Sequence, residues 1–185
     1  MTYPRRALLK ATASGAMLFA VAGRTHLLTP RQARAKEAAF RLLKDAEIRC
    51  LDAMGEALVP GSASAGLAHF VDAQLSCSFA ESLLTVRYLD IAPPWEPFYR
   101  SALAATNKAA QARYGGAFHT LSSEQASKLV EAMANNAIPD WAGPPSALVL
   151  FVLRADAVDV RYGTMAGFDG LDIPYLAHIE PEDRW

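Results

Sequence analysis

The sequence has little cysteine, no long apolar run and no recognisable cofactor motif. Its 185 residues include only two cysteines, too few for a disulfide-dense small scaffold. No apolar stretch approaches the roughly 20 residues that a membrane-spanning helix needs. With 52% apolar and 20% charged residues, the composition is that of a globular protein and excludes a disordered or collagen-like chain.

Acidic residues are missing from the first 35 positions, which carry six lysines and arginines. The remaining 150 residues hold 12 basic and 19 acidic side chains, so this part of the chain has a net charge of −7. Binding of a phosphate backbone needs basic side chains concentrated on the folded part of a protein. The charge distribution therefore argues against a nucleic-acid partner.

The basic beginning of the chain has the order of an export signal. Arg5 and Arg6 stand directly before Ala-Leu-Leu, Lys10 closes this run, and an uncharged stretch of 13 residues follows over 11–23. The pattern resembles a twin-arginine signal, except that Pro4 stands where such signals usually have serine or threonine. The twin-arginine route carries proteins that are already folded, often with a cofactor or a bound partner.

A cleavage site follows the uncharged stretch. Ala33 and Ala35 form the small-x-small pattern that precedes signal-peptide cleavage. We therefore expect a signal peptide over 1–35, a mature chain that begins at Lys36 without a membrane span, and a periplasmic location reached through the twin-arginine translocase. The alternative is a basic or amphipathic N-terminal helix on a cytoplasmic protein.

Apolar residues at helical spacing dominate the mature chain, and proline and glycine pairs separate the periodic segments. Ser122 and Gln125 form a capping-box pattern at the start of one segment. The residues predict helices over 36–59, 67–75, 97–114, 122–134 and 146–156. The segment 79–91 fits either a helix or a short extended piece, of which we favour the helix. We therefore expect a single all-α domain over 36–185, with about five helices and a long irregular C-terminal tail from 159.

The predicted core follows from the same periodicity. The apolar run 148–153 is hydrophobic on every side of a helix, which predicts a central, fully buried position. The expected core residues, taken from four of the helices, are Leu51, Met54, Phe70, Val71, Leu129, Val149 and Leu150.

No motif for catalysis or cofactor binding is present. The sequence has no G-x-G-x-x-G or Walker loop, no C-x-x-C-H and no H-E-x-x-H, and its histidines are scattered. Asp156 and Asp159 are three residues apart, which is compatible with an acid–base or metal pair but more typical of solvated surface charges. We expect no catalytic, cofactor-binding or metal-binding residue in this chain, and no enzyme activity by itself.

The two cysteines, Cys50 and Cys77, leave two alternatives open. If the first two long helices pair antiparallel, the thiols face each other and form a disulfide, which persists in an exported protein. Otherwise both are buried free thiols that pack as small hydrophobic side chains.

The C-terminal tail combines aromatic rings and arginine with glycine in a segment without periodicity. Aromatic and arginine side chains are the usual anchors of protein interfaces. The tail therefore predicts a partner interface, although its rings are also suited to covering the chain's own helices. The candidate interface residues are Arg161, Tyr162, Phe168, Tyr175 and Trp185.

Several short motifs, in this order, resemble the gluconate 2-dehydrogenase subunit 3 family, the small subunits of periplasmic flavin dehydrogenases. The C-terminal motif differs from the Tyr-Gly-Gly-Asn form of gluconate dehydrogenases proper. The matching motifs, which follow the twin-arginine leader, are Leu58-Val59-Pro60-Gly61, Ala65-Gly66, Phe70-Val71-Asp72, Phe98-Tyr99, Gly116-Ala117-Phe118 with Leu121, and Tyr162-Gly163-Thr164 through Gly167-Phe168 to Ile173-Pro174-Tyr175.

The resemblance implies an accessory role. In such complexes FAD and the catalytic residues belong to a large subunit of the glucose–methanol–choline oxidoreductase type, and a cytochrome c subunit often accepts the electrons. The small subunit carries the export signal and supports folding of the catalytic subunit for a sugar, glycoside or polyol substrate. The alternatives are a stand-alone exported binding module and an autonomous enzyme with an unrecognised site.

Overall fold

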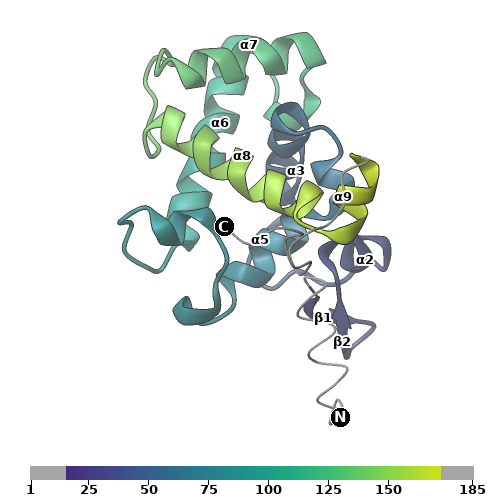
Figure 1. Cartoon of the computed structure of the whole chain (residues 1–185). Helices are drawn as coiled ribbons and strands as arrows, with labels where there is room; N and C mark the ends of the chain where they lie inside the picture. Colours follow the sequence, from purple (N-terminus) through teal and green to yellow (C-terminus); the bar gives the residue numbers. More distant parts are fainter. Residues whose placement is uncertain (1–15, 172–185) are drawn as a thin grey trace, which may run out of the picture.

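The computed structural model describes residues 16–171, and its helices surround a core to which α3 and α8 contribute centrally (Figure 1). The elements are, in chain order, β1 (Met17–Val21), β2 (Arg24–Leu28), α2 (Pro30–Ala35), α3 (Asp45–Leu58), α4 (Ser62–Ala65), α5 (Leu67–Leu75), the 3-10 turns η1 (Phe79–Glu81) and η2 (Thr85–Tyr88), α6 (Glu96–Tyr114), η3 (Phe118–Thr120), α7 (Ser123–Ala134), α8 (Ser146–Tyr162) and α9 (Met165–Gly170).

The predicted all-α class is confirmed for the described residues. Five helices there have nine or more residues, namely α3, α5, α6, α7 and α8. Helix α3 contacts α5, α6, α7 and α8, so it is the common neighbour of the other four. The capping box at Ser122 and Gln125 forms as predicted, because each side chain bonds the other residue's backbone N–H.

The expected leader region has a defined structure where the residues are described. Strands β1 and β2 pair antiparallel from Met17–Leu28 to Val21–Arg24, at the end of the molecule opposite α7 (Figure 1). Helix α2, which contains Ala33 and Ala35, packs against α4 and α5. The arginine pair and Lys10 of the expected export signal lie outside the described residues.

The first predicted helix is shorter than expected, because α3 begins at Asp45 and not at Lys36. The preceding segment is held in a non-helical form by Asp72, whose carboxylate accepts hydrogen bonds from three consecutive backbone N–H groups at 41–43. Glu47 then accepts a hydrogen bond from the backbone N–H of Lys44 and caps the helix at its first turn. The apolar periodicity before Asp45 therefore led to a wrong prediction, because these residues are not helical.

The segment 79–91 is also not the predicted helix, since only the two short turns η1 and η2 form there. Its backbone donors are bound by side chains from elsewhere in the fold. The N–H of Leu83 donates to Gln74 Oε1 at 2.7 Å, and the N–H of Thr85 donates to Asp156 Oδ1 at 2.9 Å. These two tertiary hydrogen bonds replace the helical ones.

Helix α8 is longer and less central than predicted. It extends to Tyr162, and α9 follows directly, so the irregular tail does not begin at 159. Phe151 is 46% exposed and Leu148 is half-buried, which corrects the prediction that the run 148–153 is buried on every side. The helix lies across the face of α3, and one side of it remains in solvent (Figure 1).

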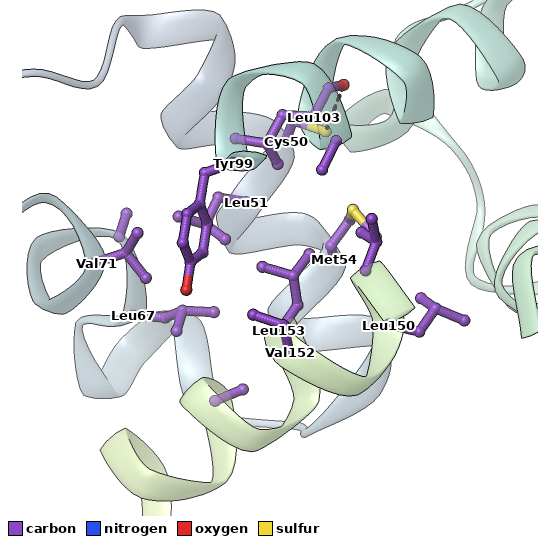
Figure 2. Packing of buried hydrophobic residues seen from close by; sticks show 14 of the residues in the cluster. Cys50, Leu51, Met54, Leu67, Val71, Tyr99, Leu103, Leu150, Val152 and Leu153 are labelled. Atoms are coloured by element: carbon purple, nitrogen blue, oxygen red, sulfur yellow. Dashed lines mark hydrogen bonds between the residues drawn. The ribbon is translucent and has the colours of Figure 1, made fainter. Parts of the chain in front are cut away.

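All seven predicted core residues are buried. Figure 2 shows how Leu51 and Met54 of α3, Val71 of α5 and Leu153 of α8 point into one cluster with Tyr99 of α6. The core positions were predictable because each lies on the apolar face of a helix whose type was correctly assigned.

Replacement of Leu150 by alanine is expected to lower the free energy of unfolding by about 2–5 kcal/mol, because it leaves a cavity in the main core. Urea denaturation of the purified protein measures the change. Phe151→Ala is the matched control: its ring is 46% exposed and one position along the same helix, so a much smaller loss is expected. Equal losses in the two variants would contradict the packing of α8.

Candidate partner-binding surface

The two carboxylates of the pair Asp156 and Asp159 differ in burial. Asp156 is fully buried on α8, where it accepts hydrogen bonds from Tyr99 Oη at 2.5 Å and from the backbone N–H of Thr85. Burial raises the pKa of Asp156 to about 6, although both hydrogen bonds act in the opposite direction. Asp159 is exposed. Asp156 thus connects α8 to α6 and to the segment at Thr85 through hydrogen bonds. It is not the solvated surface charge that the sequence suggested.

The disulfide alternative for the cysteines is not realised in the structure, where both are free thiols. Cys50 is buried on α3 and its thiol donates to the backbone carbonyl of Leu103 at 3.8 Å (Figure 2). Cys77 is half-buried beyond the end of α5 and donates to the carbonyl of Gln74. The two thiols contact different elements because α3 meets α5 with Cys50 turned toward α6. Burial raises the pKa of the Cys50 thiol to about 12.

Neither a metal-binding cluster nor a membrane-spanning helix occurs among the described residues. Between 16 and 171, no three side chains of histidine, cysteine, aspartate or glutamate are grouped so as to hold a metal ion. None of the helices in that range is long and apolar enough to cross a bilayer.

An exposed patch of aromatic and arginine side chains lies on the non-helical segment between α5 and α6. Phe79, Leu83 and Tyr88 are 52%, 53% and 69% exposed. The Arg87 guanidinium lies 5.6 Å from the ring centres of both Phe79 and Tyr88, so one cation connects the two rings. We call these four residues the aromatic patch. They combine the residue types that dominate binding energy at protein interfaces.

Buried neighbouring residues hold the aromatic patch in a fixed position. Leu84 and Val86, which alternate with the exposed residues, are completely buried in the main core. Arg87 Nη1 donates to the carbonyl of Ser82 at 2.7 Å, which fixes the guanidinium between the rings. The Phe79 ring also lies 5.3 Å from that of Trp95, at the start of α6. An exposed apolar surface that is already ordered loses little conformational entropy on binding.

A hollow of about 310 Å³ adjoins the aromatic patch. Its walls come from the end of α5, from Phe79 and from the proline pair before α6, with Cys77 and Trp95 among the lining residues. A larger groove of about 730 Å³ lies between α6 and the segment 137–141, where Lys108, Arg113 and Trp141 contribute to the walls. The hollow, unlike the groove, is continuous with exposed aromatic rings, because Phe79 belongs to both.

The residues predicted from the tail do not gather into one site. Arg161 and Tyr162 belong to the last turn of α8, and the guanidinium lies 5.1 Å from the tyrosine ring centre. Arg161 also packs against Gly61, where a β-carbon would lie 2.7 Å from its Nε atom. Phe168 is half-buried on α9. Tyr175 and Trp185 lie outside the described residues.

Comparison with known protein families places the helical part of the chain in a family. The profile of the family described as gluconate 2-dehydrogenase subunit 3 matches residues 45–168, which is about two thirds of the chain. The chain belongs to the gluconate 2-dehydrogenase subunit 3 family. No curated protein and no solved structure matches it.

The family match spans α3 to α9 and therefore contains the aromatic patch, but it leaves out the hairpin and α2. Several motifs that carry the resemblance have structural roles within it. Asp72 holds the segment before α3, and Tyr99 bonds Asp156 in the core. Gly61 and Gly66 have positive φ angles of 86° and 93° at the two ends of α4, a conformation that glycine adopts without strain.

The aromatic patch was missed by sequence reasoning. In a segment interpreted as helix, Phe79, Leu83 and Arg87 share one face, so the apolar members appeared to be core residues. Apolar residues fill most of the positions from 83 to 89, so no periodicity separates the buried members from the exposed ones. The segment's true form depends on Gln74 and Asp156, whose contacts are not readable from spacing.

We expect the pH dependence of stability to change when Asp156 is replaced by asparagine. Since the folded pKa of about 6 exceeds the ordinary 3.8, the folded chain binds a proton more tightly between these values. The stabilisation from this site is therefore complete below pH 4 and lost as the pH rises through 6. The amide of the variant cannot titrate, so urea denaturation should show that the native chain loses stability relative to Asp156→Asn between pH 4 and pH 7.

The control for this measurement is Asp140→Asn, which neutralises an exposed carboxylate at a positive φ of 51° that asparagine tolerates. Its difference from the native chain should stay nearly constant over the same pH range. A constant difference for Asp156→Asn as well would show that the buried carboxyl does not titrate in this window.

Proposed function

We propose that this chain is the non-catalytic small subunit of a periplasmic, flavin-dependent sugar, glycoside or polyol dehydrogenase. The observation that carries the proposal is membership of the gluconate 2-dehydrogenase subunit 3 family over residues 45–168. FAD and the reacting groups then belong to a partner of the glucose–methanol–choline type, and a cytochrome c subunit accepts the electrons. This chain carries the export signal and stabilises the folded partner.

Two features support an escort of this kind. The first is the leader, in which Arg5, Arg6 and Lys10 have the pattern of a twin-arginine signal and no acidic residue occurs before Lys36. The second is the aromatic patch, an ordered and exposed apolar surface within the family segment. A subunit that must stay attached to a folded partner during export needs a surface of this chemistry.

The experiment is to tag the full chain at its C-terminus in its native host and to purify it from the periplasmic fraction. A flavin spectrum and a second polypeptide are expected in the purified material. Arg5→Lys combined with Arg6→Lys should leave the complex in the cytoplasm, because the arginine pair is what the translocase recognises. Flavin bound by the chain alone, or sugar oxidation by it without another polypeptide, would contradict the proposal and favour an autonomous enzyme.

Within this function the aromatic patch is the proposed docking surface for the catalytic subunit. Tyr88→Ala removes a ring that is 69% exposed and lies beside the Arg87 guanidinium. We expect the affinity for the partner to fall about 30-fold or more, as at interface residues worth about 2 kcal/mol, with no change in the helical spectrum of the chain. Co-purified flavin per chain and titration of the separated subunits measure this effect.

Phe151→Ala is the matched control, since it removes an exposed ring from α8. The tail provides the competing interface, and truncation after Leu171 removes Tyr175 and Trp185 while keeping every described element. If truncation abolishes binding and Tyr88→Ala does not, the interface lies in the tail, and the aromatic patch is not the docking surface.

A further inference from the structure

The part of the chain that the sequence assigns to a removable leader contributes to the folded body. Phe19 of β1 is 4% exposed and Leu28 of β2 is 7% exposed. Together with Ala33, Ala38 and Ala73 they form a second hydrophobic cluster beside the main core. Ala73 belongs to α5, so this cluster joins the hairpin to a helix of the family segment.

Hydrogen bonds attach the hairpin to residues on the other side of the expected cleavage site. The N–H of Ala39 donates to the carbonyl of Ala20 at 2.9 Å, and Arg41 Nη2 donates to the carbonyl of Leu18 at 2.9 Å. Gln74 Nε2 donates to the Met17 sulfur at 3.2 Å. The contacts therefore extend from the first strand to both the 38–41 segment and α5.

The cleavage site itself lies in a packed, capped helix. Ala33, the first small residue of the small-x-small pattern, has no exposed surface. Arg34 forms an ion pair with Asp52 of α3, with Nη1 and Oδ2 2.5 Å apart. At the start of the helix, the Pro30 carbonyl lies so close to Gly66 that a β-carbon there would overlap it. Helix α2 thus contacts α3 through Arg34, and it contacts α4 and α5 near Gly66, the residue between them.

A peptidase must take the residues around the bond it cuts into its cleft, and in a folded protein this requires local opening of the segment. The twin-arginine route delivers folded proteins, so the signal peptidase meets this chain with α2 already packed. Opening α2 would expose Ala33 to solvent and separate Arg34 from Asp52. The cleavage rate is then reduced by the fraction of molecules in which α2 is open.

We propose that residues 17–35 are retained in the exported subunit, because the packing of α2 protects the bond between Ala35 and Lys36 from signal peptidase. The proposal rests on export through the leader described above, and it revises the expectation that the mature chain begins at Lys36. The hairpin and α2 are then a permanent part of the subunit, which covers Ala38 and Ala73 in the assembled protein.

The test is the intact mass of the full chain recovered from the periplasmic fraction, measured alongside the flavin content of the same material. We expect a mass that includes residues 17–35. A periplasmic chain that begins at Lys36 and still carries the flavin partner would overturn this inference and leave the proposed function standing. Absence of the chain from the periplasm would overturn both.

Gly66→Ala tests the mechanism of protection. The new β-carbon would overlap the Pro30 carbonyl and push α2 away from α5, so the cleaved fraction should rise roughly tenfold or more. Gly115→Ala is the matched control: its φ of 76° gives it comparable backbone strain, but no atom lies within 4 Å of the new β-carbon. Equal processing of the two variants would show that α2 does not protect the bond.

A second pair of variants keeps the test valid if Gly66→Ala does not fold. Arg34→Gln breaks the ion pair with Asp52 without changing either small residue of the cleavage pattern. Arg31→Gln removes an exposed arginine from the same helix and serves as its control. More cleavage in Arg34→Gln than in Arg31→Gln is expected, and the same amount in both would contradict the proposal.

Discussion

The course of the chain between α2 and α3 depends on the carboxylate of Asp72. This side chain is 4% exposed and accepts the backbone N–H groups of Arg41, Leu42 and Leu43 at 2.8–2.9 Å. Hydrogen bonds to a charged acceptor are stronger than neutral ones, and a buried N–H without a partner costs about 1–3 kcal/mol. The Asp72 carboxylate therefore determines where the chain after α2 can lie and, through it, where α3 begins.

Buried side-chain oxygens also accept backbone N–H groups from the segment between α5 and α6. Gln74, two residues from Asp72, accepts the N–H of Leu83, and Asp156 accepts that of Thr85. Both side chains are buried, so each non-helical segment is attached to the helical framework by a polar group that the core encloses. Because the attachment is buried, the residues between these points stay ordered, and the exposed side chains of Phe79 and Tyr88 keep defined positions.

Helix periodicity predicted the elements whose conformation local spacing determines, and failed where tertiary hydrogen bonds decide it. Leu51, Leu129 and Val149 were placed in the core correctly because they lie on apolar faces of true helices. The start of α3 and the 79–91 segment were wrong because acceptors 30 and 71 residues away compete for their backbone donors. The aromatic patch shares that cause, since exposure within it depends on the same contacts.

The division between the family segment and the residues before it separates two kinds of constraint. From α3 onward, helices bury apolar faces against one another, and the buried residues of this main core include none from the hairpin. Phe19 and Leu28, by contrast, are buried in the second hydrophobic cluster, with Ala33 of α2, Ala38 and Ala73 of α5. An export leader normally needs no contacts with its cargo, because it is discarded. Under the proposed export, residues 17–35 differ from such a leader because Phe19, Leu28 and Ala33 complete a hydrophobic cluster, and their removal would expose apolar surface that the folded chain buries.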